Sequence, residues 1–208
     1  MATTKSAGQL KLEAGRLCLD FANTLDWHAS DHPIEKLNAY ADLIAWGHKI
    51  GLLSEPAARL LTDRATAHPQ TAQAALEKAR TLREAAYAIF VAASHSETPQ
   101  QADLDTVNAM LAQLLNRSRL VRTDSGFVWD WAGGDDDFDQ VLWWVVQSAT
   151  EVLTSDELQR VGQCADDRGC GWLFYDTSKN RTRRWCDMRG CGNRAKARRH
   201  YAKVTSDE

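Results

Sequence analysis

The chain has 208 residues, of which 44% are hydrophobic and 25% are charged, with a net charge of −3. This composition is that of a soluble globular protein with one sizeable core and room for a small metal-stapled module. No run approaches 18 apolar residues, and residues 1–9 are polar with no apolar segment of 7–15 residues after them. We therefore expect neither a membrane span nor a signal peptide, and we expect a cytoplasmic protein.

Residues 1–155 are predicted to be mostly helical. All four prolines stand where a helix would begin, and Thr98 with Gln101 has the spacing of a capping box. Apolar residues then recur with the helical period of 3.6. These signals predict helices at residues 34–49, 56–67, 69–94, 99–114 and 138–152.

A β-hairpin is predicted at residues 119–131, where Asp124-Ser125-Gly126 separates two β-prone runs. Trp143 and Trp144 are adjacent on the last predicted helix, so they cannot both lie at the centre of its apolar face. Either one of them meets another surface, such as the hairpin or the C-terminal module, or a wide apolar stripe buries both.

Four of the five cysteines lie in the last 45 residues, as two close pairs. Five residues separate Cys164 from Cys170, four separate Cys186 from Cys191, and fifteen lie between the pairs. This spacing favours a structural zinc ion, because four thiolates fill a tetrahedron and leave no open position for catalysis. Two disulfides or four unrelated buried thiols are the alternatives. Cys18 lies in an apolar run and is expected to be a small buried hydrophobe.

The charge is divided unevenly along the chain. Residues 160–203 contain twelve basic and four acidic residues, a net charge of +8, whereas residues 1–159 have a net charge of −9. A basic segment of this kind suits a polyanion, because neutralised phosphates release counterions. Two or three of these basic residues could instead balance the negative charge of a four-thiolate zinc site.

The C-terminal module is predicted to be a β-hairpin followed by a helix. Residues 171–176 and 181–185 are expected to be its strands, with turn residues between them. Asn193 is expected to cap a basic helix at residues 194–203. The fold class predicted for the whole chain is therefore mainly α with a small β-hairpin (α+β).

Several motifs resemble a known pair of domains. The run Trp185-Cys186-x4-Cys191-Gly192-Asn193-Arg194, preceded by Cys170-Gly171-Trp172-Leu173-Phe174, is similar to the CGNR zinc finger. The runs Leu17-Cys18-Leu19-Asp20-Phe21-Ala22-Asn23-Thr24 and Tyr40-Ala41-Asp42-Leu43-x-x-Trp46 resemble the mostly helical ABATE domain that usually precedes it.

The resemblance implies an ABATE-like domain at 1–155 and a finger at 160–204, in a bacterial stress-induced transcription regulator. The finger is expected to be a treble-clef-like or ribbon-like module. Its zinc ligands would be Cys164, Cys170, Cys186 and Cys191. The first pair departs from the family's usual four-residue spacing, and Gly169 could absorb the additional residue as a bulge.

Two sets of residues are candidates for binding. The nucleic-acid candidates are basic residues of the finger, and their alternative roles are a solvated surface or, for Arg194, bracing Asp176 or a cysteine sulfur. The candidates for a small-molecule site in the helical domain share roughly one helix face, and the alternative is that this helix simply packs at a surface. The nucleic-acid candidates are Arg183, Arg184, Arg194, Lys196, Arg198 and Arg199. The small-molecule candidates are Asp20, Asn23, Trp27 and His28.

No nucleophile elbow, phosphate loop or paired carboxylate is visible, so an enzyme is not expected. The first hypothesis is a zinc-dependent regulator that binds double-stranded DNA, with the helical domain acting as a sensor or forming a homodimer. The second is a zinc-folded protein-interaction module whose basic face binds an acidic partner. The third is a small-molecule-binding helical domain with an accessory finger.

Overall fold

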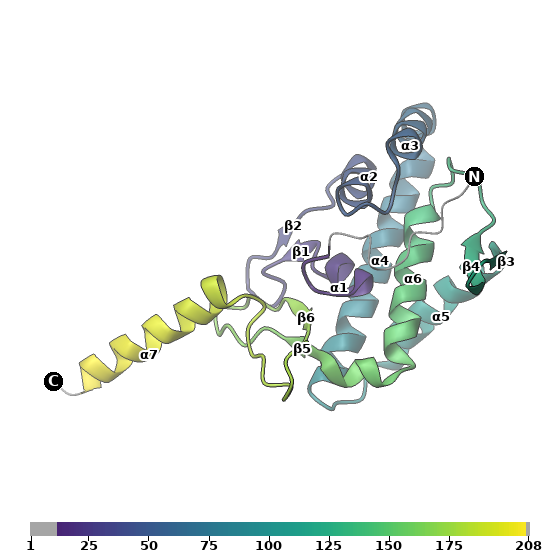
Figure 1. Cartoon of the computed structure of the whole chain (residues 1–208). Coiled ribbons are helices and arrows are strands. Elements are labelled where there is room, and N and C mark those ends of the chain that lie inside the picture. The colour runs from purple at the N-terminus through teal and green to yellow at the C-terminus, as the bar shows by residue number, and fades with distance from the viewer. Residues whose placement is uncertain (1–11, 207–208) are drawn as a thin grey trace.

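The computed structural model of the chain describes residues 12–206 (Figure 1). Helix α5 packs against both α4 and α6, and α7 extends away from the body to the C-terminal end. The α-helices are α1 (Leu17–Ala22), α2 (Tyr40–Lys49), α3 (Glu55–Ala67), α4 (Pro69–Ser94), α5 (Gln101–Leu115), α6 (Gln140–Leu153) and α7 (Asn193–Ser206). Three antiparallel two-stranded sheets complete the fold of residues 12–206, which confirms the predicted mainly α class. Within the described residues, no helix has the length and apolarity needed to cross a bilayer.

The apolar residues that recur with the helical period form the core of the body. α4 begins at Pro69 as predicted and buries one face along its 26 residues. α6 buries the opposing apolar face, including Val141, Leu142 and Val145. The short α1 packs between these two helices, and Cys18 is completely buried there, as expected for a small hydrophobe. Burial raises the pKa of the Cys18 thiol to about 12, so this thiol stays protonated.

The predicted helix at 34–49 is wrong in its first turn. The strand β2 (Ile34–Glu35) pairs with β1 (Leu25–Asp26), and α2 begins only at Tyr40. Glu35 explains the difference, because its two carboxylate oxygens accept hydrogen bonds of 2.6 Å from the guanidinium of Arg83 on α4. Arg83 is buried, and a buried guanidinium needs such a partner.

The capping box predicted at Thr98 and Gln101 is absent. α5 begins at Gln101 after Gln100, whose side chain makes no capping hydrogen bond. The residue before a proline is biased away from the helical region, so Thr98 favours an extended backbone, and the helix starts after Pro99.

The hairpin predicted at 119–131 is confirmed as β3 (Ser118–Thr123) and β4 (Gly126–Trp131). Trp143 of α6 meets it: the indole Nε1 donates to Ser118 Oγ at 2.6 Å, and its ring lies 5.8 Å from that of Trp131. Trp144 is partly buried against the same core. The hairpin therefore closes one end of the body above α5 and α6.

The C-terminal module uses a different strand pair from the predicted one. β6 (Leu173–Tyr175) was expected, but its partner is β5 (Val161–Gln163), before the first cysteine, and not residues 181–185. Residues 181–185 are instead held by separate contacts: Arg183 N donates to the Asp176 carboxylate, and Arg184 O accepts from Ala165 N. Val161 and Leu173 fill the core against the body, which fixes this pairing.

The module and the helical body thus share a core. Leu173 packs with Cys18 and Leu19 of α1 and with Phe90 of α4. Asn23, at the end of α1, is buried and bonds both backbone groups of Leu173: its Nδ2 donates to the carbonyl and its Oδ1 accepts from the N–H, each at 2.9 Å. The Asn23 side chain therefore pairs with both backbone groups of Leu173 in β6, and this links α1 of the body to the module.

Asn23→Ala should lower the free energy of unfolding by about 2–4 kcal/mol, because it leaves the buried N–H and C=O of Leu173 without partners. Urea denaturation of the zinc-loaded protein measures this change. Asn116→Ala is the matched control, since Asn116 is exposed, and its effect should stay below about 0.5 kcal/mol. Equal effects of the two substitutions would contradict the bridging role of Asn23.

Candidate metal centre

Four cysteine side chains converge at the junction of the module and the body. Cys164 directly follows β5, Cys170 shortly precedes β6, and Cys191 lies in a single π-helical turn, η3 (Met188–Gly192), which leads into α7. Cys186 comes from the loop before η3. The four sulfur atoms all lie within 4.8 Å of one another.

The distances between sulfurs fit a zinc ion and not a disulfide. Cys186 Sγ lies 3.7 Å from Cys170 Sγ and 3.6 Å from Cys191 Sγ. Four thiolates at the usual Zn–S distance of 2.3 Å from one ion are separated by about 3.8 Å. A disulfide requires about 2.05 Å. A donor set of four clustered cysteine sulfurs is that of a structural Zn²⁺ site, in which protein fills all four positions of the tetrahedron.

The long first knuckle is accommodated by glycine. Gly169 has φ +86°, in the left-handed region, and its N–H bonds to the carbonyl of Asp166, which closes a turn inside the five-residue spacer. A Cβ at Gly169 would lie 2.5 Å from Ser30 Cα. The additional residue is therefore absorbed where the knuckle touches the body, at a position that only glycine fits.

The second knuckle is held by its own polar groups. Asp187 Oδ2 accepts from Gly190 N at 2.6 Å, and Asp187 O accepts from Gly192 N at 3.0 Å. Arg194, one turn later, donates from Nη2 to Cys191 Sγ at 2.8 Å. Asn193 is the first residue of α7, and among the described residues its side chain has no hydrogen-bond partner, so the expected cap is not formed.

Asp166 is the buried anchor around which the basic residues assemble. Its side chain is fully buried and accepts from Arg194 at 3.2 Å, from Arg198 at 3.2 Å and from Arg168 at 3.4 Å. Burial opposes its ionisation, but hydrogen bonds from Arg168 and Arg194 outweigh burial and hold the pKa of Asp166 well below its usual range. The predicted contact of Arg194 with a cysteine sulfur is present, whereas its predicted carboxylate partner, Asp176, is replaced by Asp166.

The helical body supplies one wall of the metal centre. Trp27, with φ +54°, packs against the cysteine cluster, and the guanidinium groups of Arg168 and Arg194 lie 5.2 and 5.6 Å from its ring centre. Trp172 Nε1 donates to Asp26 Oδ1 at 2.8 Å. The loop that follows α1 therefore shields the sulfurs from solvent and stacks on the arginines around them.

The four residues considered for a small-molecule site each make contacts of their own in the described structure. Asp20 accepts from the N–H groups of Glu13 and Ala14, Asn23 bonds Leu173, and Trp27 packs on the sulfurs. His28 stacks on Tyr87, with ring centres 3.4 Å apart, and bonds Glu84 at 2.8 Å. Three of them, Asn23, Trp27 and His28, thus lie where the body meets the module, a role that only the tertiary contacts reveal.

The six predicted nucleic-acid residues divide into two groups. Three are engaged inside the module: Arg194 and Arg198 hold Asp166, and Arg183 donates to backbone carbonyls of Tyr175, Trp185 and Cys186. The other three are exposed, and within the described part of the chain none has an acidic partner. We call them the basic face: Arg184, Lys196 and Arg199.

Comparison with known families agrees with this architecture. The ABATE model, described as "Putative stress-induced transcription regulator", matches residues 15–156, and the CGNR zinc finger model matches residues 160–204. Both resemblances inferred from the sequence are therefore confirmed. The two families are regulatory or zinc-binding and not enzymatic, as expected. A search of curated proteins gives no match.

Replacing one cysteine of the cluster should abolish tight zinc binding. Cys186→Ser removes a sulfur that lies within 3.7 Å of two others, and the zinc content of the purified protein should fall from about one ion per chain to near zero. Cys18→Ala is the control, because this thiol lies in the core of the body and should leave the zinc content unchanged. Full zinc content in Cys186→Ser would contradict the four-sulfur assignment.

Asp166→Asn should weaken zinc binding without removing a ligand. The substitution removes the charge that positions Arg194 beside Cys191, and the zinc affinity measured by chelator competition should fall about 10- to 100-fold. Asp167→Asn is the matched control: its side chain is 72% exposed, and among the described residues it pairs with Arg198. A loss of affinity that is equal in both variants would show that general charge, and not this contact, is responsible.

Proposed function

Because this chain belongs to the ABATE family and carries a CGNR zinc finger, we propose that it is a zinc-dependent transcription regulator that binds double-stranded DNA through the finger. In this proposal Cys164, Cys170, Cys186 and Cys191 ligate a structural Zn²⁺. The ion fixes the fold of the finger and takes no part in chemistry.

The observation that carries the proposal is the projection of α7 from the zinc centre. The helix leaves the body and extends into solvent (Figure 1). Its sequence contains Arg194, Lys196, Arg198, Arg199 and Lys203 and no acidic residue. Its 14 residues span about 21 Å, and an α-helix of ordinary diameter fits the major groove of B-DNA.

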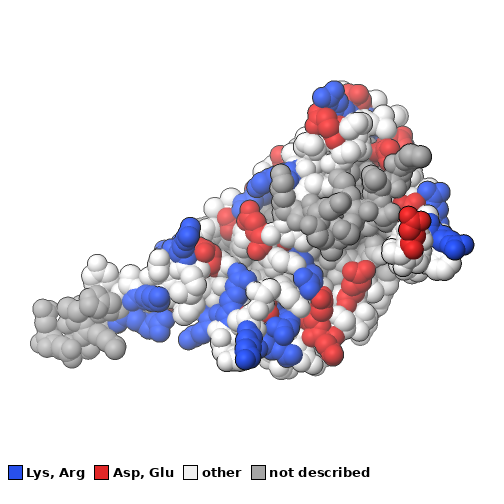
Figure 2. Space-filling view, viewed as in Figure 1, with Lys and Arg blue, Asp and Glu red and all other residues white. Residues whose placement is uncertain are grey.

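The charges on the surface agree with a polyanionic partner. Lys and Arg side chains gather over the zinc module and the first part of α7 (Figure 2). Within the basic face, Arg184 and Arg199 flank the ring of Trp185, at 5.3 and 5.7 Å from its centre. This arrangement keeps two guanidinium groups from different segments near one indole ring, which suits contact with more than one phosphate.

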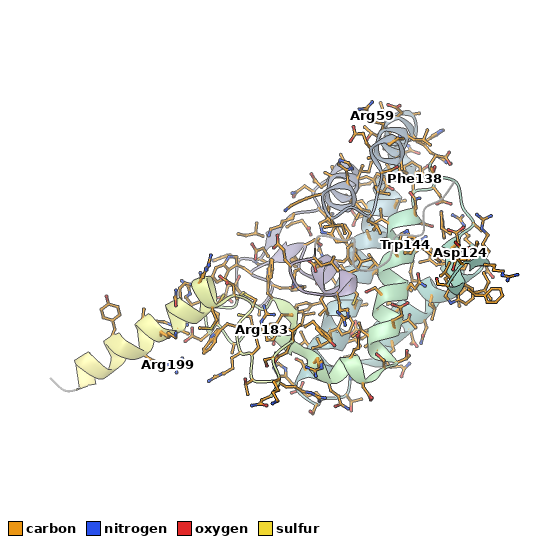
Figure 3. The ribbon with its side chains drawn as sticks, viewed as in Figure 1. Arg59, Asp124, Phe138, Trp144, Arg183 and Arg199 are labelled. Atoms are coloured by element: carbon orange, nitrogen blue, oxygen red, sulfur yellow. The ribbon has the colours of Figure 1, made fainter. Side chains whose placement is uncertain are left out.

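The arginines inside the module have a supporting part in this proposal. Arg194 and Arg198 tie the first turns of α7 to Asp166, so the helix leaves the metal centre in a defined direction. Figure 3 shows Arg183 within the module and Arg199 on the projecting helix. We therefore assign direct phosphate contact to Arg184, Lys196 and Arg199, and positioning to Arg183, Arg194 and Arg198.

The helical body is proposed to be the sensing part of the regulator. Support comes from the wall that it contributes to the metal centre, through Trp27 and the Asn23–Leu173 pair. The segment between Cys164 and Cys170 rests on this wall and holds α7 through Asp166. A change in the body that moved the wall would therefore move the base of α7. A homodimer would place two such helices on two half-sites.

Binding of the zinc-loaded protein to a random DNA duplex should weaken steeply as salt rises, because several phosphates are contacted. Neutralising the basic face with Arg184→Gln, Lys196→Gln and Arg199→Gln together should lower the affinity and reduce the slope of log affinity against log salt by about three. Fluorescence anisotropy over a salt series measures both quantities.

Arg59→Gln is the control for net charge. Arg59 is exposed on α3, at the opposite end of the molecule from α7 (Figure 3), and its loss should leave the slope unchanged. Absence of DNA binding by the zinc-loaded wild-type protein at low salt would reject the proposal. Binding of an acidic protein surface with the same dependence on the basic face would favour an interaction module instead.

A further inference from the structure

A second site is suggested by an apolar cavity in the helical body. It lies between the C-terminal half of α5, the hairpin and α6, and its volume is about 160 Å³. Its apolar walls are formed by Leu111, Leu114, Leu115, Trp129, Trp143 and Val146.

The size of the cavity limits what can enter it. An engineered protein cavity of about 150 Å³ with apolar walls accommodates benzene. The cavity here is therefore suited to one aromatic ring or a branched alkyl group of similar size, and not to a molecule of drug size. Trp129 forms a wall that is half exposed, so a ring can stack on it from solvent.

The polar side chains at the rim differ in whether their hydrogen-bonding groups already have partners. The hydroxyl of Ser118 accepts from Trp143 and donates to Leu114 O, and the hydroxyl of Thr150 donates to Val146 O, so both are occupied. Gln147 and Glu151 lie one turn apart on α6 at the same rim. Among the described residues, neither side chain has a hydrogen-bond or ion-pair partner.

The charge at this rim is negative. Burial, followed by the nearby Glu157, raises the pKa of Glu151, and the opposing attraction of Arg16 offsets this only in part. The cations around it have other positions: Arg16 pairs with Glu157, Arg119 pairs with Asp130, and Arg122 lies two positions beyond the Trp129 pair on β3. A positively charged group on the ligand would therefore supply the partner that the protein does not.

We propose that this cavity binds a small hydrophobic cation: one aromatic or branched apolar group in the cavity, with a primary ammonium group at Glu151 and Gln147. The ring lies against Trp129, and the ammonium group donates to the Glu151 carboxylate and the Gln147 amide oxygen. An ammonium group near the indole face gains a further electrostatic attraction.

The position of the site on α6 connects it to the metal centre. α6 continues through η2 (Asp156–Arg160) and β5 directly into Cys164. A ligand that bears on Glu151 therefore contacts the helix that leads into the first zinc knuckle. The role of such a ligand as an effector of DNA binding rests on the proposed function, whereas its binding to the cavity does not.

The test is a titration of the full-length, zinc-loaded protein by calorimetry with three probes of one shape. These are 2-phenylethylammonium, the neutral 2-phenylethanol and the anionic 3-phenylpropionate. We expect the ammonium probe to bind at least threefold more tightly than the alcohol, and the carboxylate to bind most weakly. Glu151→Gln should remove the preference for the ammonium probe over the alcohol while the alcohol still binds.

Two further variants make the result specific. Thr150→Phe places a ring in the cavity and should weaken all three probes at least tenfold, and a normal zinc content shows that the variant is folded. Glu97→Gln, before the N-terminal end of α5, removes an exposed carboxylate away from the cavity and should change nothing. Equal binding of the ammonium and the alcohol, tighter binding of the carboxylate, or no binding of any probe would each overturn the proposal. None of these outcomes involves DNA, so they are distinct from failure of the proposed function.

Discussion

The charge of four thiolates around one divalent ion is the constraint on which the C-terminal module depends. Such a site has two net negative charges, and the protein must surround it with cations or hydrogen-bond donors. Arg194 supplies a direct donor to Cys191, and buried Asp166 collects Arg168, Arg194 and Arg198 at the same place. The basic composition of this segment therefore has two origins, and only the residues left outside this network are free to meet a partner.

A second consequence is that the finger is not folded by zinc alone. Its hairpin packs into a core with α1 and α4, and Asn23 and Trp27 of the body contact Leu173 and the sulfur cluster. Gly169 and Gly171 have left-handed backbones, and Ser30 and Ala29 of the body lie where their side chains would be, so both features favour glycine at these positions. Two segments that match separate family models thus share one packed interface, and a change in either is felt by the other.

The sequence predicted the parts that depend on local signals. The helices that begin at Pro69 and near Pro56, the Asp124-Ser125 turn and the cysteine spacing each follow from a few adjacent residues. The predictions are wrong where a residue distant in the sequence determines the local structure. Glu35 leaves the predicted helix because Arg83 needs its carboxylate, and β6 pairs with β5 because Val161 and Leu173 fill the same core. Likewise, the sequence predicted a bracing role for Arg194 alone, whereas tertiary contacts with Asp166 and with backbone carbonyls show that Arg198 and Arg183 are also engaged inside the module.

The contacts at the base of α7 explain how a small finger can be connected to a large helical body. Arg194 and Arg198 hold the first turns of α7 to Asp166, and the knuckle that contains Asp166 rests on the loop with Trp27. The direction of the projecting helix is therefore set by a few contacts that the body completes. A ligand or partner that shifted this loop or α6 would act at the base of α7, which is about 21 Å long. A small rotation of the helix about its base would move its far end by a larger distance.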